Sequence, residues 1–153
     1  MDWKLELVVV PVADVDRAKA FYAEGLGWHV DVDRAKAFYA EGLGWHVDVD
    51  HRAGEDFRVV QISPPGSACS ITLMRNEGAA GSLQGLHLVV ADIEQAHRAL
   101  SEGGVDAGEV FHYEEGVQAP GPDPARSDYG SFLHFSDPDG NGWLVQEVPS
   151  RGA

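Results

Sequence analysis

The sequence of 153 residues is poor in cysteine and in long apolar runs, with Cys69 as its one cysteine. A single cysteine excludes an internal disulfide and a thiolate metal cluster. No apolar stretch approaches the roughly 20 residues that span a bilayer, so a transmembrane helix is not expected. The opening stretch, MDWKLELVVVPV, has no basic segment ahead of a long apolar one and does not resemble a signal peptide. We therefore expect a cytoplasmic protein.

Basic residues are also scarce, since 11 Lys and Arg stand against 25 Asp and Glu and give a net charge of −14. This charge repels phosphates, so neither nucleic acid nor an anionic membrane is an expected partner. It mildly favours cationic ligands, although solubility alone is the simpler explanation of the acidity. Hydrophobic residues at 44% and charged residues at 24% are ordinary for one globular domain.

The most unusual feature present is a perfect tandem repeat, because residues 14–30 and 31–47 are both DVDRAKAFYAEGLGWHV. Each copy combines a capping Asp, an amphipathic segment and glycines at its end, which predicts a helix. A strand–helix–strand unit needs only one such helix, so we expect residues from about Leu26 to Gly44 to be surplus. Either copy can fill the helix position. The second copy should then form an additional helix, packed at a dimer interface or exchanged between subunits.

A second, divergent repeat organises the whole chain. The segments LELVVVPV and LHLVV are apolar, β-branched strands, and each precedes a helix with an Asp cap. FRVVQISPPGSACSITLM and SFLHFSDPDGNGWLVQEV each read as strand, Pro/Gly turn and strand. Residues 4–75 and 84–148 are therefore predicted to form two βαβββ modules. Matching the modules pairs Val9 with His87, Gln61 with His134, and Thr72 with Gln146.

Two motifs carry a resemblance to a known family: VxDxDRAxxFYxxxLG in the first module and FxDPDGNGW near the end. Together they resemble the vicinal oxygen chelate superfamily, which includes glyoxalase I, extradiol dioxygenases, fosfomycin-resistance transferases and bleomycin-resistance proteins. The resemblance implies an α+β fold in a single domain, residues 1–153, whose two modules curl around a shared cleft. The duplicated helix segment would be an addition to the first module. The family also implies a homodimer.

The resemblance places the family's metal ligands at Leu7, Gly85 and Leu144, with Ser70 as the fourth position. None of these offers the carboxylate or imidazole that a divalent cation prefers, so we predict no metal site and no cofactor. A displaced divalent-metal site using His87, His134 and Glu147 is a less favoured alternative, because Glu147 is predicted on the opposite strand face.

Strand alternation selects the candidate binding residues of the cleft. His87 and Gln146 each lie two residues from an inferred ligand position and so share its face. His134 corresponds to a cleft-facing position of the fosfomycin-resistance branch. The candidates for ligand binding are His87, His134, Gln146, Gln61 and Thr72, which makes the second module the more polar side. Their role could be passive, in a wall that binds a ligand, or His87 or His134 could act as a general acid or base.

Three functions remain open at this point. The preferred one is a glyoxalase/bleomycin-resistance-like protein that binds a small molecule in the cleft without the usual metal ligands. The alternatives are a lyase, isomerase or transferase of the same superfamily with an atypical site, and a duplication variant whose interest is conformational. Tyr113, Arg126 and Tyr129, in a Pro/Gly-rich stretch predicted as a surface loop, could form a lid over a ligand or belong to an ordinary solvated loop.

Overall fold

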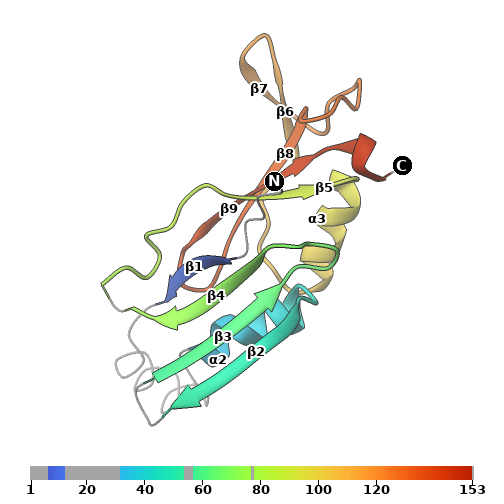
Figure 1. Cartoon of the computed structure of the whole chain (residues 1–153). Helices are drawn as coiled ribbons and strands as arrows, with labels where there is room; N and C mark the ends of the chain where they lie inside the picture. Colours follow the sequence, from blue (N-terminus) through green and yellow to red (C-terminus); the bar gives the residue numbers. More distant parts are fainter. Residues whose placement is uncertain (1–6, 13–31, 54–56, 77, 153) are drawn as a thin grey trace, which may run out of the picture. The chain divides into compact units, whose positions relative to one another are not determined.

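The computed structural model describes residues 7–12, 32–53, 57–76 and 78–152, which form two compact units (Figure 1). The first unit comprises Met1–Leu83 with Asp137–Asn141, and the second comprises Gln84–Ser136 with Gly142–Ala153. Each unit contains one sheet with a helix packed on it, so the α+β class is confirmed. None of the described helices is long and apolar enough to cross a membrane.

The first unit has a four-stranded sheet in the order β1-β4-β3-β2. β1 and β4 are parallel, and the remaining neighbours are antiparallel. A bulge between Val47 and Val49 interrupts the pairing of β2 with β3. The strands are β1 (Leu7–Val12), β2 (His46–Ala53), β3 (Phe57–Ser63) and β4 (Ser70–Arg75).

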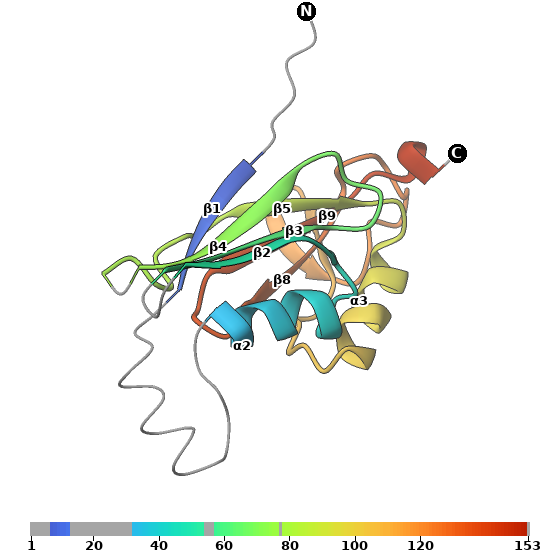
Figure 2. The same ribbon diagram turned by 60° about the horizontal axis from the view of Figure 1, so that its bottom comes forward.

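The helical segment of the first unit is the second copy of the tandem repeat. It consists of α2 (Val32–Ala37) and the π-helical turn η1 (Phe38–Gly42), and it lies on β3 and β4 (Figure 2). Val32, Ala35 and Tyr39 are buried there. The sequence-based expectation that this copy is the surplus one is wrong, because the copy that continues directly into β2 fills the position on the sheet. The first copy, residues 14–30, lies outside the described residues, so helix exchange between subunits stays a prediction.

The second unit repeats the strand order of the first and adds one strand, giving β5-β9-β8-β6-β7. Its helix begins after Asp92, whose side chain accepts a hydrogen bond from the backbone N–H of Gln95, and it ends at Gly103. The elements are β5 (Leu86–Val90), α3 (Ile93–Glu102), β6 (Phe111–Glu114), β7 (Val117–Pro120), β8 (Ser131–Ser136) and β9 (Gly142–Glu147), followed by the 3₁₀ turn η2 (Pro149–Gly152).

The β6–β7 hairpin corrects in part the prediction that residues 112–128 form a surface loop, because residues 112–120 belong to the hairpin while residues 121–128 contain no strand. Phe111 pairs with Pro120 and Glu114 with Val117, and the pairing of Phe111 with Phe132 attaches the hairpin to β8. The turn at Glu115 and Gly116 has positive φ angles at both residues, as a tight hairpin turn requires. The glycines and prolines that suggested a loop therefore stand at the ends of short strands.

The core of each unit lies between its helix and one sheet face. In the second unit Leu133, Val145 and Glu147 are almost fully buried on the face covered by α3, while the intervening residues of the same strands are more exposed. In the first unit Val60, Ile62 and Leu73 are buried in the same way beneath α2. Each sheet therefore keeps a second face that its own helix does not cover.

Candidate functional site

The helix-free face of the second unit carries both predicted histidines. His87 and His134 pair with Leu144 from opposite sides, and both imidazoles are exposed. They lie two strands apart, so roughly 10 Å separates their backbones. This spacing prevents a direct hydrogen bond but lets both rings contact one ligand lying across β9.

Gln146 lies on the same face, two residues beyond Leu144. It pairs with Val89 of β5 and Phe132 of β8. Its side-chain amide donates a hydrogen bond to the backbone carbonyl of Tyr129, at 3.2 Å. Gln146 therefore holds the loop before β8 against the sheet. The sequence had predicted this face but not the contact.

Four rings form an aromatic row on this face, which we define as Phe111, Tyr113, Phe132 and His134. Phe111 is 5% exposed and stacks on Phe132 and His134, with ring centroids 5.6 and 5.3 Å apart. Tyr113 meets both phenylalanines edge-on and is itself 57% exposed. Such geometry leaves ring faces and edges available to a flat apolar partner.

Sequence reasoning missed most of the aromatic row. The alternation in SFLHFS places Phe132 on the face of His134, so this signal was available. Tyr113 was not assigned because residues 112–128 were predicted to be a loop, and Phe111, directly before them, was not assigned to a strand. Tyr113 is therefore part of the sheet face and not of a lid.

A pocket of about 410 Å³ opens beside the aromatic row. It contains His134 together with Gly85 and Leu144, two positions that the family resemblance had assigned to metal ligands. The remaining lining residues are Gln84, Phe135, Ser136, Gly142 and Trp143. This pocket can accept an apolar group, with the imidazole of His134 and the amide of Gln84 as polar contacts.

The opposite, helix-covered face is organised by Glu147, which is fully buried. Its carboxylate accepts hydrogen bonds from the backbone N–H of Ile93 at 3.0 Å and from the hydroxyl of Ser131 at 2.7 Å, and it pairs with Arg126. Glu147 thus joins the start of α3 to β8 and to the loop before it. A displaced metal site containing His87, His134 and Glu147 is wrong, because the carboxylate faces away from the imidazoles.

Arg126 is consequently a structural residue of this face and not part of a lid. Besides Glu147 it pairs with Glu94 and Asp92 at the start of α3, at 3.1 and 3.7 Å. Burial lowers the pKa of Arg126, but the surrounding carboxylates, Glu147 foremost, raise it more, so the net shift is upward. The backbone of Arg126 has a positive φ of 50°, and its N–H donates a hydrogen bond to the carbonyl of Asp123 at 2.9 Å.

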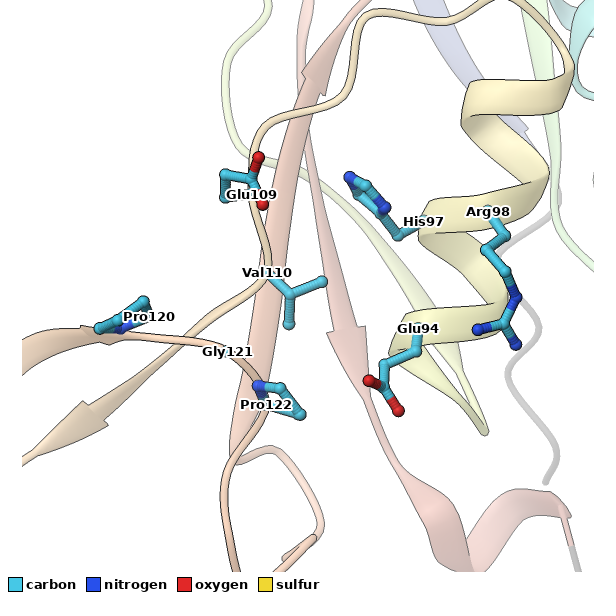
Figure 3. A pocket seen from close by; sticks show the side chains of 8 residues that line it. All are labelled: Glu94, His97, Arg98, Glu109, Val110, Pro120, Gly121 and Pro122. Carbon is cyan, nitrogen blue, oxygen red and sulfur yellow. The ribbon is translucent and has the colours of Figure 1, made fainter.

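A second pocket, of about 530 Å³, lies on the helix side of the same unit (Figure 3). Figure 3 shows Glu94 and His97 reaching into it from α3, with Glu109 on the segment opposite. Arg98, Val110, Pro120, Gly121 and Pro122 complete the lining. Its charges are mixed in sign and it contains none of the predicted site residues, so it offers no selective chemistry comparable to that of the aromatic row.

The helix-free face of the first unit is different in character. Gln61 pairs with Thr72, which is 4% exposed, and Thr72 pairs with Val9. This row corresponds to His134, Leu144 and His87 in the second unit. Sequence matching had set Thr72 against Gln146, but the strand registers set it against Leu144, because the two hairpin turns differ in length.

Three polar side chains meet near the Val47/Val49 bulge of the first unit. The hydroxyls of Ser63 and Ser70 lie 2.7 Å apart, and Ser63 donates to the carboxylate of Asp48 at 2.6 Å. The imidazole of His46 is 3.9 Å from that carboxylate. Because the serine donates to Asp48 directly, no imidazole stands between them to accept its proton, and the group does not have the arrangement of a nucleophilic triad.

Within the described ranges, no three His, Cys, Asp or Glu side chains gather so that they could hold a metal ion. At Ser70, Gly85 and Leu144, three of the positions to which the resemblance assigned the family's ligands, the chain offers one hydroxyl, no side chain and one alkyl group. This donor set does not fit a divalent cation.

Comparison with known proteins gives a consistent picture. The family model described as Glyoxalase/Bleomycin resistance protein/Dioxygenase superfamily matches residues 30–145. A second model, described as Bleomycin resistance protein-like N-terminal, matches residues 7–30. No curated protein matches the chain.

Solved structures similar to this chain cover nearly all of it. TnmS3, an antibiotic-binding protein from Streptomyces sp. CB03234, is 25% identical with a TM-score of 0.63, covering 96% of this chain and 97% of its own. A glyoxalase/bleomycin resistance protein from the same organism is 27% identical with a TM-score of 0.60, covering 94% and 100%. UcmS2, at 22% identity, a TM-score of 0.64 and coverage of 97% and 100%, supports the fold alone.

Proposed function

This chain belongs to the glyoxalase/bleomycin resistance protein/dioxygenase superfamily, and we propose from that premise that it binds a flat, largely apolar small molecule without converting it. The proposed site is the helix-free face of the second unit. The observation that carries the proposal is the aromatic row, in which Phe111 supports Phe132 and His134 by stacking. A preformed set of rings favours a planar ligand, because little side-chain entropy is lost on binding.

The comparison with TnmS3 supports the class of ligand. That protein binds an antibiotic, and its similarity extends over 96% of this chain. We therefore propose an antibiotic-like compound with fused or conjugated rings. The net charge of −14 favours a cationic or neutral compound over an anionic one.

The proposed polar contacts are His87, His134 and Gln146. The two imidazoles lie on either side of Leu144, so a ligand lying over β9 would meet one at each end. Gln61 and Thr72 are proposed as the corresponding polar positions of the first unit. Contacts to donors and acceptors would fix the orientation of a ligand whose affinity comes from ring stacking.

Binding without turnover is preferred over catalysis because of the residues at the family's ligand positions. Gly85 and Leu144 line the pocket beside His134 and supply no donor. The alternative is an enzyme of the superfamily in which His87 or His134 moves a proton. Incubation with a bound ligand followed by mass spectrometry separates the two, since binding returns the ligand unchanged and catalysis gives a product of altered mass or isomeric form.

The binding proposal is tested by isothermal titration with three planar probes of similar size: the cation proflavine, neutral anthracene carboxamide and anionic anthracene sulfonate. We expect the cation and the neutral probe to bind and the anion to bind least. Tyr113→Ala and His134→Ala should each weaken binding about tenfold, in line with the loss of one stacking contact. Glu102→Gln, on the exposed side of α3, is the control and should bind as the unaltered protein does.

Equal binding of all three probes, or affinities that Tyr113→Ala and His134→Ala leave unchanged, would contradict this site. Loss of binding in Glu102→Gln as well would show that the measurement follows general stability.

We also propose that the chain acts as a homodimer. The sheet of the first unit keeps a face that its helix does not cover, and Val49 and Phe57 are 43% and 46% exposed on that face. Superfamily members often cover such surfaces with a second subunit, as the family resemblance implies. Sedimentation at micromolar concentration should give twice the 16.5 kDa mass of one chain, and a species of 16.5 kDa would contradict the dimer.

A further inference from the structure

We propose that the first unit exchanges between two registers that differ by seventeen residues, so that either residues 15–33 or residues 32–50 supply the helix and the first part of β2. The basis is that the sequence identity is longer than the tandem repeat itself. The residues after the second copy, Asp48–Asp50, repeat Asp31–Asp33, so residues 14–33 are identical to residues 31–50. The structure of residues 32–50 is described, and residues 15–33 have the same amino acids in the same order.

The buried contacts of the helix are all made from within the repeated stretch. Val32, Ala35 and Tyr39 are at most 2% exposed against the sheet. The Tyr39 hydroxyl donates a hydrogen bond to the carboxylate of Asp137, at 2.9 Å, and the Tyr39 ring packs against Trp45. Asp137 and the strands β3 and β4 lie outside the repeat. A shift of seventeen residues would present the same sheet with Val15, Ala18, Tyr22 and Trp28.

The ion pairs around the helix could also form after the shift of seventeen residues. Lys36 donates to Asp50 at 2.8 Å, and both residues lie in the repeated stretch. Arg58, on β3 and outside the repeat, pairs with Asp50 at 2.9 Å and also with Asp33. After the shift, Asp33 would take the place of Asp50 beside Arg58. The other two places would be taken by Lys19 and Asp16.

The registers differ only in the last part of β2 and in the position of the connecting segment. His51–Ala53, which are exposed, would give way to Arg34–Lys36. The exposed pair between Arg52 and Asp33, 3.6 Å apart, would be lost, and such pairs contribute little to stability.

The number of residues between neighbouring elements would also be similar in the two registers. Nineteen residues separate the end of β1 from the start of α2 in the register described, and residues 37–56 would separate β2 from β3 in the other. Since the cost of closing a loop depends on the logarithm of its length, two connections of such similar length contribute similarly. Burial, ion pairs and loop length therefore do not strongly favour one register over the other.

The two family models divide the chain between the copies. One matches residues 7–30, which contain β1 and the first copy, and the other matches residues 30–145, which contain the second copy and the chain after it as far as Val145. Each copy is thus compatible with the family pattern in its own sequence context. This agrees with the proposal that either copy can form the helix that packs on β3 and β4.

Cross-strand disulfides distinguish the registers directly. Val59 on β3 pairs with His51 in the register described and would pair with Arg34 in the other. In a Cys69→Ser background we would compare H51C/V59C with R34C/V59C, because paired strand positions have a Cα separation that suits a disulfide. E41C/V59C, whose cysteines pair in neither register, measures chance encounters. After mild oxidation, peptide mapping quantifies each disulfide.

We expect R34C/V59C and H51C/V59C each to cross-link several-fold more than E41C/V59C. Cross-linking of R34C/V59C at the level of E41C/V59C would overturn the proposal. Phenylalanine variants give a second measure without cysteine. Y22F and Y39F should each lower the folding equilibrium constant about twofold and the double variant roughly tenfold, because one buried hydrogen bond is lost only when both tyrosines are changed. A tenfold loss in Y39F alone would also overturn it.

Discussion

The two units hold their helices by different means. In the first unit α2 is attached through Asp33 and Lys36 to the partly exposed pair of Asp50 and Arg58, whose side chains are 30% and 12% exposed. In the second unit the start of α3 rests on Glu147, which is 0% exposed and bonded to three groups. The helical segment of the first unit combines surface charges with the buried hydrogen bond from Tyr39 to Asp137, whereas the start of α3 rests on a single buried carboxylate.

The difference shows which helix contacts could be made by either copy of a duplicated segment. The contacts of α2 are made largely by residues that the tandem repeat carries twice, whereas Glu147 and Arg126 each occur once and fix the position of α3. A unit held by repeatable contacts tolerates an extra copy of its helix. The second unit, which carries the aromatic row, has no such freedom in its described contacts.

The largest predicted effect is on the buried carboxylate. Glu147→Ala should lower the free energy of unfolding by about 3 kcal/mol, because the Ile93 N–H and the Ser131 hydroxyl lose their acceptor in a buried place and Arg126 loses its main partner. Urea unfolding followed by circular dichroism measures the loss.

Glu147→Gln is the matched control, since it keeps the shape and one acceptor oxygen and should retain part of the lost stability. Equal stability of Glu147→Ala and the unaltered protein would show that the attachment of α3 depends on apolar packing alone.

The second prediction sharpens the comparison of the two helix-free faces. Under the proposed function, His134→Ala should weaken proflavine binding about tenfold, or about 1.4 kcal/mol, because the ring that stacks on Phe111 at 5.3 Å is removed. Gln61→Ala, at the corresponding place of the first unit, should have a smaller effect. Isothermal titration of both variants tests the order, and a larger loss in Gln61→Ala would move the main site to the first unit.

Much of the sheet could be predicted because strand alternation is a local signal. His87 and Gln146 were placed on one face by a period of two from positions that the family resemblance supplied, and His134 by its correspondence with the fosfomycin-resistance branch; the strand registers put all three on one face. The burial of Glu147 on the opposite face follows from the same rule. Neither inference required knowledge of distant contacts.

The errors arose where distant contacts decide the structure. The β6–β7 hairpin is stabilised by the pairing of Phe111 with Phe132, so its prolines and glycines alone indicated a loop. Thr72 was matched with the wrong strand residue because hairpin turns of different length shift the register. The structure places the second helix copy on the sheet, and two identical sequences contain no signal that separates them.

A smaller effect is predicted for the surface charges of the first unit. The hydrogen bonds from Arg58 and then Lys36 hold the pKa of Asp50 well below its ordinary value. Asp50→Asn should nevertheless lower the unfolding free energy by only about 1 kcal/mol, since the pair is partly exposed. The difference should shrink in 0.5 M salt, where such pairs are screened. A loss that salt leaves unchanged would indicate a buried rather than a surface interaction.

The smallest predicted effect is a pH dependence in the β6–β7 hairpin of the second unit. His112 is 5% exposed, and its ring nitrogens lie 2.9 Å from the Gly121 carbonyl and 3.1 Å from the Glu114 carboxylate. The carbonyl, followed by the carboxylate, raises the pKa of His112, because the doubly protonated ring donates to both. A pKa raised by folding stabilises the folded state below the unfolded value of about 6.5, and this contribution is lost as the pH rises through the raised pKa.

The unfolding free energy of the unaltered protein minus that of His112→Gln should therefore be largest near pH 5.5 and decrease towards pH 9. Carboxylates such as Asp123 show the opposite trend, because their lowered pKa makes their contribution to stability fall as the pH decreases. Both proteins contain these carboxylates, so the difference between the two unfolding free energies cancels that trend. Glu114→Gln is the matched control: it removes one acceptor, so an NMR titration of the His112 ring protons should give a lower pKa. A stability difference that instead grows with pH would mean that His112 acts as a neutral ring in the folded protein, and the hairpin would then be held by its strand pairing alone.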